Sequence, residues 1–142
     1  VRLYFDYAYA RRNSQSDDLL RILVSDDCGL SWTLRKDLTT DELITNGGSS
    51  VTSVFVPNSS QWEEEYVNLN PWAGNESVKI KFEFNGENGN YLYVDNIRLE
   101  SANIGLDNNV NDKNKKLIKH LRNFMTGFPR VNYQRSRGYC LS

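Results

Sequence analysis

The stretch Ser25-Asp-Asp-Cys-Gly-Leu-Ser-Trp32 decides the fold, because its Ser-x-Asp-x-Gly-x-x-Trp spacing is that of one tight β-hairpin. Asp27 can accept hydrogen bonds from turn amides, and Gly29 can take a positive φ at little cost. Trp32 is then expected to return the chain to the core. The stretch predicts antiparallel strands on both sides of the turn and supplies no catalytic group.

Period-two alternation of apolar and polar residues continues on both sides of this hairpin. Turn residues separate the alternating segments about every ten residues, as in all-β domains. The segments predicted as strands are 1–10, 19–25, 30–35, 51–56, 62–69, 78–84 and 91–99, with a helical turn between 37 and 44. No long helical pattern precedes residue 112. The sequence therefore predicts an all-β antiparallel sandwich of the jelly-roll, galactose-binding-like kind.

The last predicted strand contains an irregularity. Leu92 and Val94 share one parity, whereas Ile97 and Leu99 share the other. One inserted residue at Asp95-Asn96, a β-bulge, would place all four apolar side chains on the same face. Bulges are frequent beside functional sites, so this position is a candidate site.

Charge divides the chain into two regions. Residues 1–100 carry 9 Lys and Arg against 16 Asp and Glu, whereas residues 101–142 carry 8 against 2. This predicts a sandwich domain over 1–100, followed by a linker and a basic tail that is poorly ordered or partly helical, with an amphipathic segment at 113–125. No apolar run approaches the roughly 20 residues of a membrane helix. The tail could contact nucleic acid, but a disordered end is simpler, so nucleic acid is not expected as a partner.

The two cysteines, Cys28 and Cys140, allow one disulfide bridge at most. Cys28 lies in the hairpin turn and Cys140 lies close to the last residue. Sequence alone does not decide between a bridge and two free thiols, because a bridge depends on a Cα separation that spacing does not reveal.

Three motifs in order support a family resemblance: Phe5-Asp-Tyr-Ala-Tyr-Ala10, Val24-Ser-Asp-Asp-Cys-Gly-Leu-Ser-Trp32 and Asn90-Tyr-Leu-Tyr-Val-Asp-Asn-Ile97. Together they resemble the MAM and cleaved-adhesin group of jelly-roll accessory domains. That group occurs in large bacterial proteins exported by type IX secretion, often beside pappalysin-like metallopeptidase domains. The resemblance implies a secreted or cell-surface module that lacks its usual first strands. The tail departs from the family pattern, because it lacks the Tyr-Pro-Asn-Pro type motif that opens a sorting domain.

The resemblance further implies a structural calcium ion. Asp6 and Asp95 lie on the first and last predicted strands, which are commonly neighbours in jelly rolls. With Asn96 they could supply some of the six to eight oxygens that Ca²⁺ takes, and the loop 11–18 could supply more. The alternative is that Asp6 is a hydrogen-bonded edge carboxylate and that Asp95 pairs with a strand amine.

Aromatic residues in loops suggest a carbohydrate platform. Trp72 lies in a Pro- and Gly-containing loop, and Tyr91 and Tyr93 follow a loop rich in Asn and Gly. Sugars stack on exposed rings while amides bind their hydroxyls. The alternative is that these rings, like that of Trp62, belong to the core, as most aromatic residues of small sandwiches do.

Catalysis has little support in the sequence. The single histidine, His120, lies in the tail, which excludes a Ser-His-Asp site or a His-Glu-x-x-His zinc motif in the sandwich. Glu63-Glu-Glu65 alternates along a strand and is interpreted as a solvated face. The sequence thus predicts a non-catalytic extracellular module for adhesion, glycan binding or protein binding. In the alternative, the chain is part of a secreted metallopeptidase and only stabilises or targets the neighbouring catalytic domain.

Overall fold

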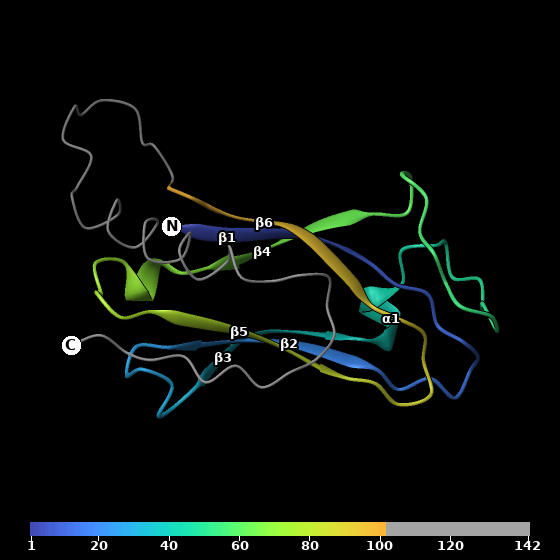
Figure 1. The fold of residues 1–142 in the computed structure, drawn as a ribbon, viewed down its shortest axis with the longest axis horizontal. Coiled ribbons are helices and arrows are strands. Elements are labelled where there is room, and N and C mark those ends of the chain that lie inside the picture. The colour runs from blue at the N-terminus through green and yellow to red at the C-terminus, as the bar shows by residue number, and fades with distance from the viewer. Residues whose placement is uncertain (102–142) are drawn as a thin grey trace.

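Two three-stranded antiparallel sheets pack face to face (Figure 1). The computed structural model describes residues 1–101. Its elements are β1 (Arg2–Ala8), β2 (Leu19–Ser25), β3 (Thr33–Thr39), α1 (Thr40–Leu43), β4 (Glu63–Asn68), the 3-10 helix η1 (Asn70–Trp72), β5 (Lys79–Asn85) and β6 (Tyr93–Glu100). The sheet orders are β4-β1-β6 and β3-β2-β5. The predicted all-β sandwich is confirmed, as is the helical turn.

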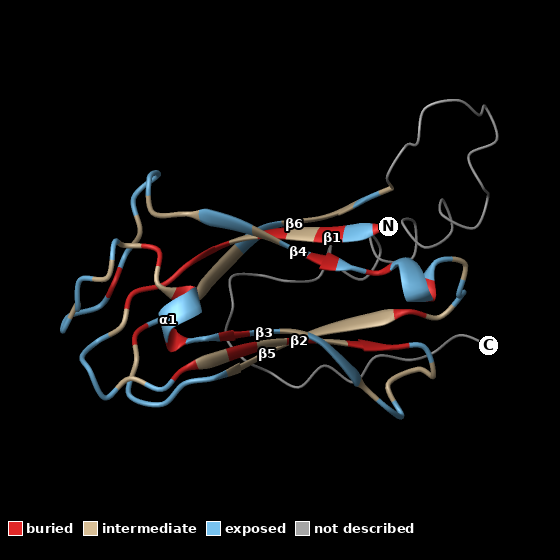
Figure 2. Cartoon of the chain, turned by 180° about the vertical axis from the view of Figure 1, so that it is seen from behind, coloured by how far each residue is buried: buried red, intermediate tan, exposed pale blue. Residues whose placement is uncertain are grey.

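The central strands β1 and β2 contribute more buried side chains than any other strands to the core, which lies between the two layers (Figure 2). On β1 the alternation predicted from the sequence buries Leu3, Phe5 and Tyr7, which are at most 4% exposed. Phe5 meets Phe82 of the other sheet edge to face, with ring centroids 5.2 Å apart. Burying one such side chain stabilises the fold by about 1.5–3 kcal/mol.

The bulge predicted in the last strand is confirmed. Tyr4 of β1 faces Arg98 of β6, and Asp6 of β1 faces Asp95 of β6. A step of two residues along β1 therefore matches a step of three residues along β6. Asn96 takes a φ of 50° there, a conformation that asparagine tolerates better than most residues. The extra residue keeps the apolar side chains of β6 turned toward the core.

A second bulge was not predicted, and it overturns one expectation. The register of β3 against β2 shifts by one residue near Arg35. Leu34 therefore lies on the outer face, 47% exposed, whereas Leu38 beyond the shift is buried. Trp32 is only half-buried, with the Lys81 amine 4.9 Å from its ring centre. The prediction that Trp32 enters the core is wrong, because the shift reverses the parity of the residues before it.

The predicted strand at 51–56 is also wrong. Its backbone groups do not pair with a neighbouring strand. The Val51 amide donates to the Arg11 carbonyl, and the other partners of this segment come largely from the Asn90 side chain. The apolar alternation of 51–56 arises because Phe55 is buried while Val54 and Val56 are exposed. A single side-chain amide thus replaces a ladder of strand hydrogen bonds.

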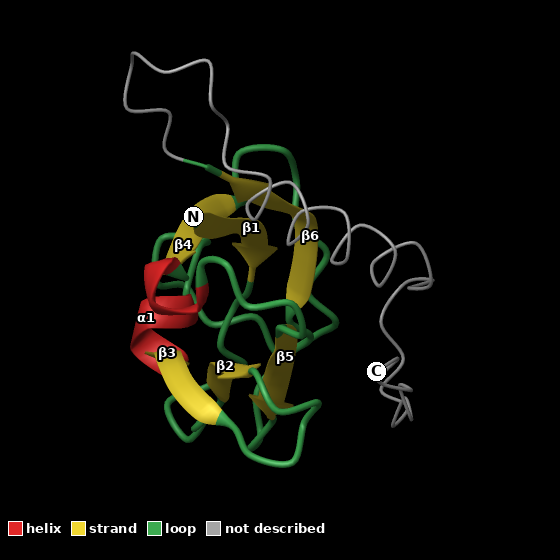
Figure 3. Ribbon diagram, turned by 90° about the vertical axis from the view of Figure 1, so that its left-hand side faces the viewer, coloured by secondary structure: helices red, strands yellow, loops and turns green. Residues whose placement is uncertain are grey.

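The two flanks of the sandwich differ (Figure 3). One flank is formed by the edge strands β3 and β4, with α1 beside them, and the other by the edge strands β5 and β6. Predictions for the tail, including the helix at 113–125, His120 and Cys140, lie outside the described residues. The same holds for a bridge between Cys28 and Cys140.

Candidate binding site

Three loops gather at the end of the sandwich that lies away from the N-terminus (Figure 1). They are residues 9–18, 44–62 and 86–92, which connect β1 to β2, α1 to β4 and β5 to β6. We call this part of the molecule the loop end. Its loops lack regular secondary structure, so side chains must satisfy many of their backbone groups.

Asp18 joins two of these loops from a fully buried position. Its side chain is 1% exposed. It accepts a hydrogen bond from the Tyr9 hydroxyl and another from the Glu87 amide at 2.6 Å. Thr40 bonds the Asp18 backbone, as acceptor at 2.6 Å and as donor at 3.0 Å. Burial, and then the bond to the carboxylate, raise the pKa of Tyr9 well above its usual value, so this hydroxyl stays a donor.

Asn90 joins the loops 44–62 and 86–92 in a similar way. Its side-chain nitrogen donates to the carbonyls of Val51 at 2.9 Å and Ser53 at 2.8 Å. Its side-chain oxygen accepts from the amides of Phe55 at 2.9 Å and Tyr91 at 3.1 Å. Every hydrogen-bonding position of this amide is used, at a residue that is 7% exposed. Asp18 and Asn90 together hold the loop end in one conformation.

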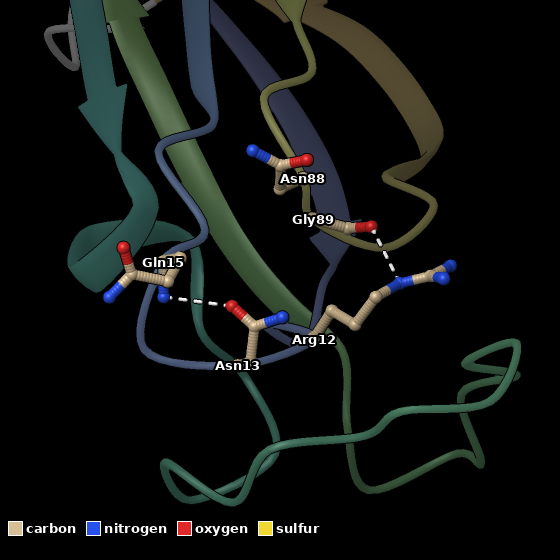
Figure 4. Close-up of a pocket in the computed structure, with 5 residues that line it drawn as sticks. All are labelled: Arg12, Asn13, Gln15, Asn88 and Gly89. Carbon is tan, nitrogen blue, oxygen red and sulfur yellow. Dashed lines mark hydrogen bonds between the residues drawn. The ribbon is translucent and has the colours of Figure 1, made fainter.

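An open, polar depression of about 470 Å³ lies where the loops 9–18 and 86–92 face each other (Figure 4). It is lined by Arg12, Asn13, Gln15, Asn88 and Gly89. The Arg12 Nε donates to the Gly89 carbonyl at 3.2 Å, which ties the two walls together. The Asn13 side-chain oxygen accepts from the Gln15 backbone amide at 2.8 Å. Within residues 1–101 the side-chain amides of Gln15 and Asn88 make no hydrogen bond, so they are available to a ligand.

The three aromatic residues predicted to bind sugar lie in different surroundings. Trp72 is 8% exposed and belongs to the core, with the Arg35 guanidinium 5.0 Å from its ring centre. The prediction of an exposed stacking platform at Trp72 is therefore wrong, because the Asn-Pro-Trp segment forms η1 and its tryptophan is buried. Tyr93 is half-buried, and its hydroxyl donates to the Phe55 carbonyl at 2.7 Å. Tyr91 is 62% exposed and follows the depression by two residues.

The residues predicted to bind calcium are brought together. Asp6 and Asp95 face each other across β1 and β6. The Asn96 side chain donates to the Asp6 carboxylate at 2.6 Å, and the Asn96 backbone amide donates to Asp95 at 2.8 Å. The alternative of a hydrogen-bonded carboxylate at Asp6 agrees with this geometry.

No larger cluster of carboxylates forms around this pair among the described residues. The loop 11–18 lies at the loop end, and an extended chain from Asp6 to Arg11 spans about 16 Å. Within residues 1–101, no three His, Cys, Asp or Glu side chains are placed around one point. Calcium prefers six to eight oxygens, and amide and backbone carbonyl oxygens count among them. The calcium site stays a prediction from the resemblance.

The hairpin turn has the structure predicted for Asp27. Its carboxylate accepts from the Ser31 hydroxyl at 2.5 Å, the Ser31 amide at 2.9 Å and the Ser25 hydroxyl at 2.7 Å. These bonds, with that from the Ser31 hydroxyl the strongest, hold the pKa of Asp27 well below its usual range. The motif is therefore a turn-stabilising element at the end opposite the depression.

Replacing Asp27 with asparagine is expected to lower the melting temperature at pH 7. Because the folded-state pKa is depressed, the stabilisation is present above the unfolded pKa of about 3.9 and is lost as the pH falls below it. The difference in melting temperature between wild type and variant should therefore become smaller as the pH falls from about 4 to about 2, as measured by thermal melts. Asp26→Asn is the control, because Asp26 is exposed and accepts one bond, from Asn75 at 3.2 Å. A melting-temperature difference that does not change with pH would contradict the role of the Asp27 carboxylate in stabilising the turn.

Comparison with known proteins gives no relative: the chain matches no family model, no curated protein and no solved structure. No helix within residues 1–101 is long and apolar enough to cross a membrane. The fold and the site together define an antiparallel β-sandwich with a polar depression at its loop end. The resemblance to the MAM and cleaved-adhesin group rests on the three sequence motifs.

Proposed function

We propose that this chain is a non-catalytic binding module whose loop end recognises glycans. The observation that carries the proposal is the polar depression, from which an exposed tyrosine, Tyr91, is two residues away along the chain. Gln15 and Asn88 offer amides that can donate to and accept from sugar hydroxyls. Arg12 adds a guanidinium, and Tyr91 adds a ring that a sugar face could cover.

The construction of the loops supports binding rather than chemistry. Asp18 and Asn90 order the loops before any ligand arrives, so binding need not restrict them further. The lining contains one charged side chain, Arg12, and no carboxylate, thiol or imidazole. Such a lining can recognise hydroxyl groups but offers no general base or nucleophile.

The resemblance places such a module in a larger secreted protein, at the cell surface or outside the cell. There it would attach its neighbouring domains to a carbohydrate-bearing surface. The competing proposal is that the chain belongs to a secreted metallopeptidase and serves its catalytic domain only through structural support or targeting. The two proposals differ in whether the isolated chain binds a ligand.

A glycan array followed by titration calorimetry tests the proposal. We expect Tyr91→Ala to weaken binding of any sugar found by about tenfold, equivalent to about 1.4 kcal/mol. The matched control is Tyr66→Ala, because Tyr66 is also exposed, at 47%, but lies on the outer face of β4. Equal losses in the two variants, or no sugar bound at millimolar concentration, would refute glycan binding at the loop end. The second result would favour the structural role.

A further inference from the structure

Within residues 1–101, the β5/β6 flank of the sandwich is less well covered than the β3/β4 flank. On the β3/β4 flank, Lys36 of β3 and Glu65 of β4 form an ion pair at 2.8 Å that joins the two sheets. The inward-facing side chains of the other flank are only half-buried, although they pack on the core. They are Ile80, Phe82 and Phe84 of β5 and Val94, Ile97 and Leu99 of β6.

The free edge of β5 is more regular than that of β6. All seven residues of Lys79–Asn85 pair with β2 without a register shift, and within residues 1–101 β5 has no partner on its other side. The strand contains no proline. β6 instead carries the bulge at Asn96, a feature that discourages edge pairing. The backbone groups along the outer edge of β5 are therefore the better template for another strand.

The sequence of β5 is complementary to itself when two copies run antiparallel. With Phe82 opposite Phe82, Lys81 of each copy lies opposite Glu83 of the other, and Ile80 lies opposite Phe84. Residues directly opposite in antiparallel strands share a face. The register thus gives two oppositely charged pairs on the outer face and apolar pairs on the inner face.

Neighbouring registers are less complementary. A slip of one residue would turn the apolar side chains of one copy to the charged face of the other. Slips that preserve the faces centre the pairing either on Lys81 opposite Lys81, with Lys79 opposite Glu83 on both sides, or on Glu83 opposite Glu83. Like charges directly opposite are destabilising. The register centred on Phe82 is the one without a like-charge pair, so the charges favour it.

We infer that the β5 edge is a homodimer interface, in which two copies of this chain join their β3-β2-β5 sheets into one six-stranded sheet around a twofold axis. Such an axis makes the contact self-complementary and closed, as in most homodimers. It also covers the half-buried Phe82 and Phe84 of both copies. Because β5 ends at Asn85, beside the loop end, antiparallel pairing directs the two loop ends away from each other. The dimer would present its two loop ends on opposite sides.

Sedimentation equilibrium of the full chain tests the dimer. We expect a mass of twice 16.4 kDa at about 100 µM, where a dimer with a Kd of about 10 µM is largely assembled. Glu83→Lys and Lys81→Glu each place like charges opposite each other twice, so each should raise the Kd about tenfold. Mixing the two variants restores both opposite-charge pairs and should restore the dimer, as should the double exchange within one chain.

Asp37→Lys is the matched control, because it reverses an exposed charge on β3, at the opposite edge of the same sheet. It should leave the dimer intact, and thermal melts should show that every variant is folded. A wild-type chain that is monomeric at about 100 µM would overturn the inference. So would a dimer that Glu83→Lys does not weaken. Variants that dissociate alone but do not associate when mixed would overturn the register and with it the interface.

Discussion

Gly89→Ala is expected to destabilise the protein by about 3 kcal/mol or more, because a side chain at this position has no space. A Cβ built on Gly89 would overlap the carboxylate of Asp18 and the hydroxyl of Tyr9. Both of these groups are buried and bonded to each other, so neither can move aside without losing that bond. Urea denaturation followed by tryptophan fluorescence measures the change.

Gly86→Ala is the control for Gly89→Ala in the same loop. A Cβ on Gly86 would lie 3.3 Å from an edge carbon of the Phe84 ring, which a small ring shift can accommodate. We expect a change within about 1 kcal/mol. If Gly89→Ala were as mild as Gly86→Ala, the Asp18 contact at the centre of the loop end would be incorrect.

Asn90→Asp is expected to cost about 3 kcal/mol at neutral pH, although it changes one atom of the side chain. The nitrogen that donates to the carbonyls of Val51 and Ser53 becomes an oxygen that repels them. Burial and these carbonyls should raise the folded-state pKa of the new carboxyl, because both disfavour its charged form. Its destabilisation should therefore grow as the pH rises above the unfolded value of about 3.9 and diminish below it.

Asn58→Asp is the matched control for Asn90→Asp. Asn58 lies in the connection 44–62, which the Asn90 side chain bonds, and it is exposed. Its side-chain oxygen accepts from the Ser60 amide at 2.9 Å and the Ser60 hydroxyl at 2.7 Å. A carboxylate keeps both bonds, so we expect little change. Thermal melts of the two variants from about pH 3 to pH 8 make the comparison. A loss at position 90 that does not depend on pH would contradict the proposed bonding.

The strands that pair regularly were predictable because local alternation records which face is buried. Residues 1–10 and 78–84 illustrate this, and the parity change at Asp95 even located a bulge. The shift near Arg35 escaped prediction because Leu30, Trp32 and Leu34 alternate without a break, and only the register against β2 turns them outward. Alternation identifies a face but does not identify which face is inner.

The residues that hold the loop end could not be found from their neighbours in sequence. Asn90 bonds groups that lie 35 to 39 residues away, and Asp18 bonds an amide 69 residues away. Asn and Asp are ordinary loop residues, so their types carried no signal of burial. The segment 51–56 resembled a strand because nothing in its own sequence shows that its hydrogen bonds come largely from the distant Asn90 side chain. Trp72 gave the opposite error: its Pro-containing loop suggested an exposed side chain, but the residue belongs to the core.

Amide hydrogen exchange of Glu87 and Phe55 tests most directly the claim that buried side chains fix the loop end. Neither amide bonds to a strand: Glu87 donates to the Asp18 carboxylate and Phe55 to the Asn90 side chain. We expect both amides to exchange as slowly as the strand amides that join β1 to β4 and β6, and β2 to β3 and β5, through global unfolding. Exchange at the rate of an exposed loop amide would show that these loops open freely and would contradict a preformed binding end.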